Sequence, residues 1–87
     1  MPSFFLGSIW VTQRAVELLG PVGIQRILTR HAAGNWGDVS SLRARANALA
    51  LDQGYPILSQ YLEPGMQVLV LTEDDRTSTW LFTAETH

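Results

Sequence analysis

Apolar and polar positions divide the chain into a short β segment, a helical middle and a β-rich end. The stretch Phe4–Val11 is rich in aromatic and β-branched residues on both of its faces, which predicts a strand that is central or partly covered. Gly7 interrupts this strand, so we expect a bulge or the close approach of another backbone there.

Two short helices are predicted next. Thr12 stands where an N-cap is expected, and residues 13–19 form two helical turns that Gly20 ends. Pro21 suits the first turn of a second helix, over residues 22–33. The apolar stripe of that helix includes a histidine and consists of Ile24, Ile27, Leu28 and His31.

A third helix is predicted over Ser41–Gln53, with Ser40 as the preferred N-cap, Asp38 as the alternative and Gly54 as its stop. Arg43 lies in the first turn, where its charge opposes the helix dipole. The face expected to point inward consists of Leu42, Ala46, Leu49, Ala50 and Gln53.

Three antiparallel strands are predicted for the rest of the chain. Residues 56–62 and 67–72 flank a turn, residues 63–66, in which proline and glycine occupy the positions that a type II turn requires. Residues 73–78 turn the chain again into a last strand, residues 79–83. This order predicts an α+β fold: an N-terminal strand, three helices, then three antiparallel strands, with the helices packed on one face of the sheet.

At 87 residues, of which 46% are hydrophobic and 16% charged, the chain suffices for a single domain, 1–87, but not for two separate cores. It contains no cysteine, which excludes disulfides and thiolate zinc sites. The first residues lack the basic segment and long apolar run of a signal peptide, and no stretch of about 18 apolar residues occurs. We therefore expect a cytoplasmic protein without a membrane segment.

The net charge of −2 hides an uneven distribution. Five arginines and two acidic residues lie between Gln13 and Asn47, whereas one arginine and six acidic residues lie between Ala48 and His87. This split predicts a basic face and an acidic face, which suits the steering of a partner and equally self-association. Every basic residue is an arginine, which favours bidentate contacts to carboxylate or phosphate.

Five motifs lie in the same order along the chain as in one family of bacterial proteins. They are Phe5-Leu6-Gly7 with Ile9, Val11, Thr12 and Ala15; His31, Gly34, Trp36, Gly37 and Asp38; Arg45-Ala46-Asn47; Leu58, Ser59 and Tyr61; and Thr72, Glu73, Asp75, Arg76 and Thr79. On these residues the chain resembles a family of small uncharacterised plasmid-related proteins, found on bacterial plasmids and integrative conjugative elements. Asn35 departs from the aspartate usual in the family, and residues 41–43 replace an acidic helix start. The resemblance implies a mobile-element setting and brings no known activity.

The element from His31 to Asp38 is the first candidate site. His31 has the chemistry of a general base or a metal ligand, but a simpler interpretation is that it closes a helix C-terminus, where a cation is favoured. No carboxylates at a recognisable ligand spacing accompany it, so we expect neither a metal nor a cofactor. Gly34 and Gly37 are expected to supply unusual backbone angles around Trp36, which plugs the corner into the core, with Asp38 as a cap.

A second hypothesis gathers six polar residues into one pocket between the sheet and the helices: His31, Asp38, Asn47, Tyr61, Asp75 and Arg76. The simpler alternatives treat them separately. Asp75 would cap its turn, Arg76 would pair with Glu73 or with a helix carboxylate, and Asn47 would make one specific hydrogen bond from mid-helix.

For function, we favour a non-catalytic interaction module of a mobile element. Its partner would be a host or plasmid protein, with a homodimer as a special case. The first alternative is nucleic-acid binding by the helix pair 22–53, in which Arg43, Arg45 and Asn47 would contact base edges. The net negative charge and the pI of about 5.5 weigh against this alternative.

The second alternative is a small enzyme, with His31 as the base and Asp38 or Asp75 as the group that orients it. No nucleophile motif, phosphate-binding loop or recognisable pair of catalytic carboxylates supports it. We therefore do not expect an enzyme.

Overall fold

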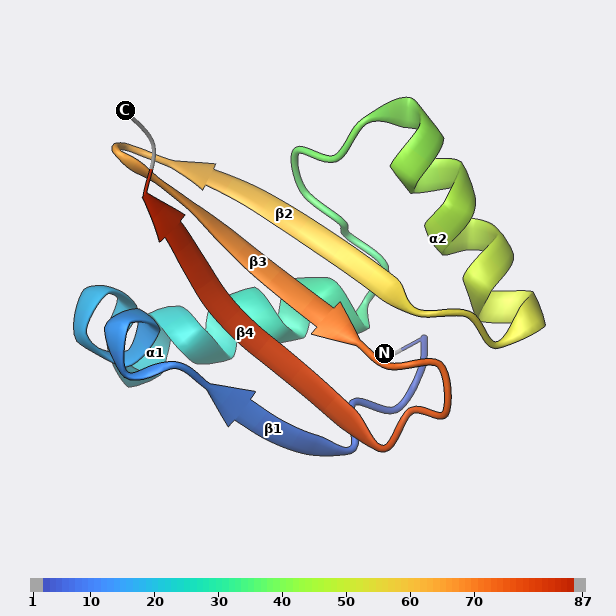
Figure 1. Cartoon of the computed structure of the whole chain (residues 1–87), viewed down its shortest axis with the longest axis horizontal. Helices are drawn as coiled ribbons and strands as arrows, with labels where there is room; N and C mark the ends of the chain where they lie inside the picture. The colour runs from blue at the N-terminus through green and yellow to red at the C-terminus, as the bar shows by residue number, and fades with distance from the viewer. Residues whose placement is uncertain (1–2, 86–87) are drawn as a thin grey trace.

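The computed structural model describes residues 3–85, which form a four-stranded sheet, a long kinked helix and a shorter helix (Figure 1). The elements are β1 (Ser8–Val11), α1 (Gln13–Ala32), α2 (Ser41–Gln53), β2 (Ile57–Glu63), β3 (Met66–Thr72) and β4 (Ser78–Glu85). The predicted α+β class is confirmed. Within residues 3–85, neither helix is long and apolar enough to cross a membrane.

The strand order in the sheet is β1-β4-β3-β2. The last three strands form consecutive antiparallel pairs, as predicted. Gly65 has a φ of 78°, which the third position of the predicted turn between β2 and β3 requires. β1 pairs in parallel with β4, with Trp10 opposite Trp80, so the sheet is mixed.

The N-terminal strand differs from its prediction in length and place. It begins only at Ser8, and it lies at the edge of the sheet rather than at the centre. The close backbone approach predicted at Gly7 is confirmed, because this residue has a φ of 68° and a Cβ there would collide with the carbonyl group of Thr77. The preceding residues leave the sheet and pass beneath the end of α1, where Ser3 N–H donates to Ala32 O at 2.6 Å.

The first two predicted helices are a single element. Thr12 caps α1 as predicted, since its hydroxyl accepts from the Ala15 N–H at 3.2 Å. Gly20 has non-helical angles (φ 68°, ψ 172°) and kinks α1, and Pro21 begins the next helical turn at once. The prediction of three helices is therefore wrong, because the glycine and proline bend the helix without inserting a loop.

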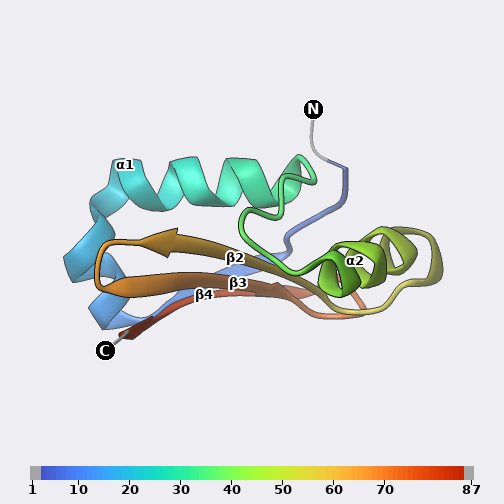
Figure 2. The ribbon, with the colours of Figure 1, turned by 90° about the horizontal axis from the view of Figure 1, so that it is seen from above.

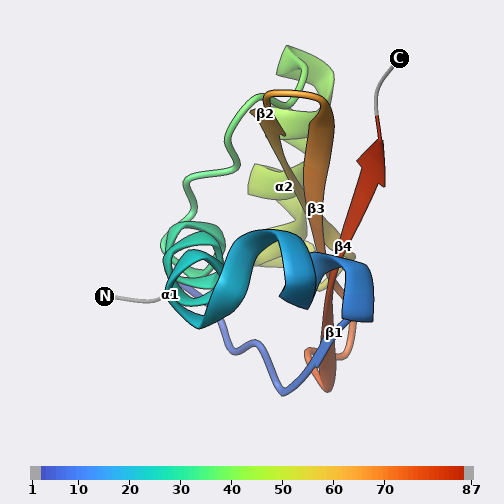
Figure 3. The same ribbon diagram turned by 90° about the vertical axis from the view of Figure 1, so that its left-hand side faces the viewer.

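α1 lies across one face of the sheet, and no helix within residues 3–85 covers the other face (Figures 2 and 3). The apolar core lies between α1 and the sheet, and its fully or almost fully buried members are Ala15, Ile27, Tyr61, Val68, Val70 and Leu81.

α2 has the predicted bounds but a different environment. It lies beside β2, not on the face that α1 covers (Figure 2). Its buried residues are Asn47 and Ala50, whereas Leu42 and Leu49 are 76% and 53% exposed. The predicted inward face is therefore confirmed at Ala50 and wrong for its leucines, because the polar Asn47 meets the sheet in their place.

Candidate functional site

His31 is fully buried between α1 and the sheet. The last turn of α1 directs its imidazole at β2 and β3, where Nδ1 lies 2.5 Å from Ser59 Oγ and Nε2 lies 2.8 Å from Thr72 Oγ1. Both ring nitrogens bond to hydroxyl groups rather than to helix carbonyls. The prediction that His31 closes the helix C-terminus is therefore wrong.

The hydroxyl groups around His31 form a directed chain of hydrogen bonds. Thr79 Oγ1 donates its one hydrogen to the Leu6 carbonyl at 2.6 Å. In its other contact, with Thr72 Oγ1 at 2.7 Å, Thr79 therefore accepts and Thr72 donates. Thr72 in turn accepts from the Nε2–H of His31, and the bare Nδ1 accepts from Ser59. This order assigns the neutral Nε2–H tautomer to His31.

Burial and, to a smaller extent, the positive charge of Arg76 lower the pKa of His31 to about 4. The imidazole is consequently neutral near pH 7. The Phe4 ring packs edge-on against it with centroids 5.2 Å apart, and the half-buried Trp36 lies 6.1 Å away. Trp36 thus covers the histidine, consistent with the predicted plug.

The outer edge of β2 is covered by polar groups from the segment 33–47. The side-chain amide of Asn47 pairs with both backbone groups of Leu58: its Nδ2 donates to the carbonyl at 2.7 Å, and its Oδ1 accepts from the N–H at 3.1 Å. Asn47 therefore replaces the peptide group of a further strand, and the specific bond predicted for it is confirmed.

The same edge is covered further along by the segment around Gly37. Gln60 N–H donates to the Trp36 carbonyl at 3.0 Å, and its carbonyl accepts from Asp38 N–H at 2.6 Å. The Asp38 carboxylate accepts from Leu62 N–H at 2.9 Å. The expectation that Asp38 caps a helix or a turn is therefore wrong, because its carboxylate binds the edge of β2 and Ser40 takes the N-cap position of α2.

Gly37 is required where this segment meets β2. It has a φ of 76°, and a Cβ there would collide with the Gln60 carbonyl and the Tyr61 ring. Tyr61 is buried, which raises its pKa, and its hydroxyl donates to Asn35 O at 2.6 Å. The Arg30 guanidinium lies 4.4 Å from the centre of the Tyr61 ring. The expectation that Gly34 and Gly37 supply unusual backbone angles is confirmed, since Gly34 also has a positive φ, of 85°.

Asp75 and Arg76 lie in the turn between β3 and β4. Asp75 accepts from the Thr77 N–H at 3.0 Å and from its hydroxyl at 2.6 Å, which lowers the pKa of Asp75 and confirms that it caps the turn. Arg76 donates to the carbonyls of Tyr55, Glu73 and Ala50 at 2.7, 3.0 and 2.9 Å. It ties the turn to the C-terminal end of α2, and the predicted pairing with a carboxylate is wrong.

The six polar residues of the pocket hypothesis are not linked to one another by hydrogen bonds in the described part of the chain. The imidazole of His31 lies between α1 and the sheet, Asp38 and Asn47 lie along the β2 edge, and Asp75 is in an exposed turn. No cluster of three or more metal-binding side chains occurs within residues 3–85. His87 lies outside the described residues.

The helix pair does not form a helix-turn-helix. Such a motif packs two helices across a turn of three or four residues, but here residues 33–40 run along β2 and separate α1 from α2 (Figure 1). Arg43 and Arg45 are exposed on α2, whereas Asn47 is buried against Leu58 and cannot contact a base.

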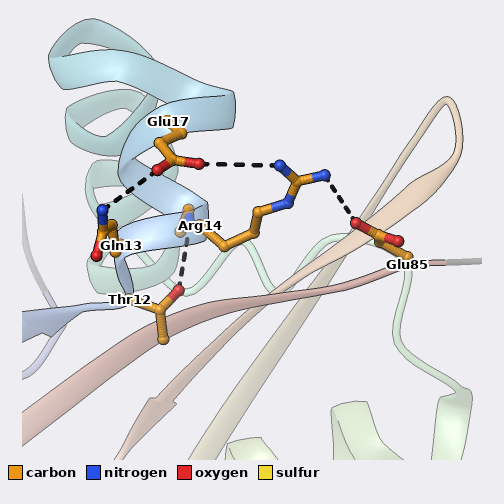
Figure 4. A network of polar contacts seen from close by, with 6 residues as sticks. Thr12, Gln13, Arg14, Glu17 and Glu85 are labelled. Carbon is orange, nitrogen blue, oxygen red and sulfur yellow. Dashed lines mark hydrogen bonds and ion pairs between the residues drawn. The ribbon is translucent and has the colours of Figure 1, made fainter.

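Exposed ion pairs tie the start of α1 to the end of β4. Arg14 lies 2.8 Å from the Glu85 carboxylate and 3.8 Å from that of Glu17 (Figure 4). Gln13 donates to the other oxygen of Glu17 at 3.4 Å. These contacts lie at the margin of the sheet.

The uncovered face of the sheet is the surface that the sequence interpretation missed. We call it the open face. Trp10 and Trp80 stack on it, with ring centroids 5.5 Å apart and ring planes 19° apart. Alternation along the four strands assigns it twelve residues, none of them charged: Ser8, Trp10, Leu58, Gln60, Leu62, Gln67, Leu69, Leu71, Ser78, Trp80, Phe82 and Ala84.

A signal for the open face was present in the sequence. β3 is apolar on both sides, with Val68 and Val70 beneath α1 and Leu69 and Leu71 on the opposite side. Such a strand is typical of a sheet that is covered on both faces.

Comparison of the chain with protein-family models, curated proteins and solved structures finds no match.

Proposed function

We propose that this protein is a non-catalytic interaction module that binds another protein chain through its open face. The observation that carries the proposal is the stacked pair Trp10 and Trp80 on β1 and β4, which are 52% and 43% exposed on an uncharged surface. Tryptophan is enriched among the residues that dominate protein interfaces, because it offers a large and rigid contact area.

The composition of the open face supports this proposal. An antiparallel sheet with one face in water normally alternates apolar residues inside with polar residues outside. Here Leu58, Leu69, Leu71 and Phe82 stand on the side away from α1. These four side chains are partly exposed, and with the more exposed Trp10, Trp80 and Leu62 they form an apolar surface of the kind that marks interaction sites in proteins.

The state of His31 supports a non-catalytic function. A general base must reach its substrate and retain a free nitrogen. His31 is fully buried, and Ser59 and Thr72 occupy both of its nitrogens. Its low pKa also leaves it a weak base. The network serves instead to hold α1 against the sheet.

On the sequence resemblance, we place the module in a bacterial, plasmid-borne setting, with a host-encoded or plasmid-encoded protein as its partner. A photo-crosslinking residue at position 80, compared with one at position 42 on α2, tests the function in bacterial cells. Both positions are exposed and apolar, but only the first lies on the open face. We expect a discrete crosslinked product from position 80 alone, and equal background from both would contradict the proposal.

A further inference from the structure

We infer that the chain bound to the open face is a second copy of this protein, with two molecules packed open face to open face about a two-fold axis. This inference rests on the proposed function, because it uses the same surface and names its partner. Two such copies would form a pair of stacked sheets about 10 Å apart, with an α1 helix on each outer side.

The absence of charge on the open face favours a second copy as the partner. In a two-fold interface the same patch is present on both sides, so any cluster of like charges would meet its own copy. None of the twelve positions is charged, although the chain carries fourteen charged residues elsewhere. The acidic residues of the strands lie at their ends, where Glu85 is paired with Arg14. Homodimer interfaces are also more apolar than those between different proteins.

The two glutamines of the open face already bond to each other within the same chain. Gln60 and Gln67 lie on neighbouring strands, and the Gln60 amide donates to the Gln67 carbonyl oxygen at 2.7 Å. Burial of a polar group costs less when its hydrogen bond is kept. This internal hydrogen bond therefore lowers the cost of burying the two amides against a second copy.

The size of the open face suits a modest dimer interface. The four strands contain 4, 7, 7 and 8 residues. With a rise of about 3.3 Å per residue and a strand spacing of about 4.8 Å, they span a plane of roughly 400 Å². This plane is about half of the roughly 800 Å² that each partner contributes to a standard interface, so the dimer interface would be small.

The small core gives a further reason for self-association. Within residues 3–85, the buried apolar cluster between α1 and the sheet has six members, with five partly buried residues packed against it, and the same layer holds the polar side chains of His31, Ser59, Thr72 and Thr79. A domain of this size buries only about 60–65% of the surface that its unfolded chain exposes. A second copy would supply the missing apolar layer on the other side of β3 and β4.

Sedimentation equilibrium over a wide concentration range tests the inference. We expect twice the monomer mass for the unaltered protein and for Leu42→Glu, which changes an exposed leucine on α2. Trp80→Glu should raise the dimer dissociation constant by at least about 100-fold, since each dimer contains the substitution twice. If Trp80→Glu fails to give the native circular dichroism spectrum, Trp10→Gln at the sheet margin replaces it, with the same expected result.

A monomer at every concentration would overturn the inference, as would a dimer that Leu42→Glu dissociates and Trp80→Glu does not. A failure of this inference can be distinguished from a failure of the proposed function. A monomeric protein that still forms a discrete crosslink from position 80 to a different, larger chain would contradict the second copy and retain the interaction module.

Discussion

The two faces of the sheet both carry apolar residues, but only the covered face buries a polar network within its apolar core. The face beneath α1 contains a buried imidazole with three hydroxyl groups, whereas the face without a helix carries two tryptophans, several leucines and no charge. In a domain that exposes one face of its sheet, the polar groups normally lie outside. The difference indicates that the buried polar groups position α1 on the sheet, while the apolar side chains of the open face are available to a partner.

The largest expected effect comes from the covered face. His31→Ala should lower the free energy of unfolding by about 3–5 kcal/mol, because it leaves a cavity and removes the partner of two buried hydroxyl groups. Trp80→Ala, on the open face, should cost the monomer about 1 kcal/mol, since this side chain is 43% exposed. Chemical denaturation at low protein concentration measures both. Equal losses would contradict the contrast between the faces.

The next effect is a loss of stability in acid. The pKa of His31 is about 4 in the folded protein and about 6.5 when unfolded, so between these values only the unfolded chain binds the proton. The contribution of His31 is complete above pH 6.5 and is lost as the pH falls to 4, by about 3 kcal/mol in total. NMR titration of the ring checks the cause, and a midpoint near 6.5 would contradict it.

A smaller effect is expected at the edge of the covered side. Asn47→Leu keeps the approximate volume of the side chain but removes both hydrogen bonds to Leu58, so we expect a loss of about 1–3 kcal/mol and faster amide exchange at Leu58. Gln53→Leu, also on α2 but exposed, is the matched control and should change stability by less than about 0.5 kcal/mol. If the two variants unfold alike, Asn47 does not hold the β2 edge.

The smallest effect is expected at the exposed ion pairs. Arg14→Ala should change the free energy of unfolding by no more than about 0.5 kcal/mol, because both of its acidic partners are in water (Figure 4). The small difference should vanish at high salt. If Arg14→Ala lowers the free energy of unfolding by more than about 1 kcal/mol and the loss persists at high salt, the ion pairs of Arg14 stabilise the fold more than their exposure suggests.

Local signals predicted much of the fold correctly. Thr12 and Ser40 cap their helices, α2 has the predicted bounds, and the turn at Gly65 joins β2 and β3 as proposed. Each of these features depends on residues a few positions apart. The parallel pairing of β1 with β4 could not be predicted in this way, because its partners are about 70 residues apart in the chain.

The candidate site was predicted less well for the same reason. The bonds of His31 go to Ser59 and Thr72, which are 28 and 41 residues away, and no local pattern connects them. On α2, the spacing of the leucines predicted the inward face. The side chain of Asn47, which pairs with the edge of β2, lies inward instead. The sequence could not predict the partners of these polar residues, because their contacts are tertiary.

The most direct test of the two-faced sheet is an isotope-filtered NOE measurement on a mixture of labelled and unlabelled protein. It detects only contacts between different molecules. We predict intermolecular NOEs from the side chains of Trp10, Trp80 and Phe82 on the open face. Their absence at concentrations where the protein is a dimer, or NOEs confined to Leu42 and Leu49 of α2, would contradict the claim that a second copy covers this face.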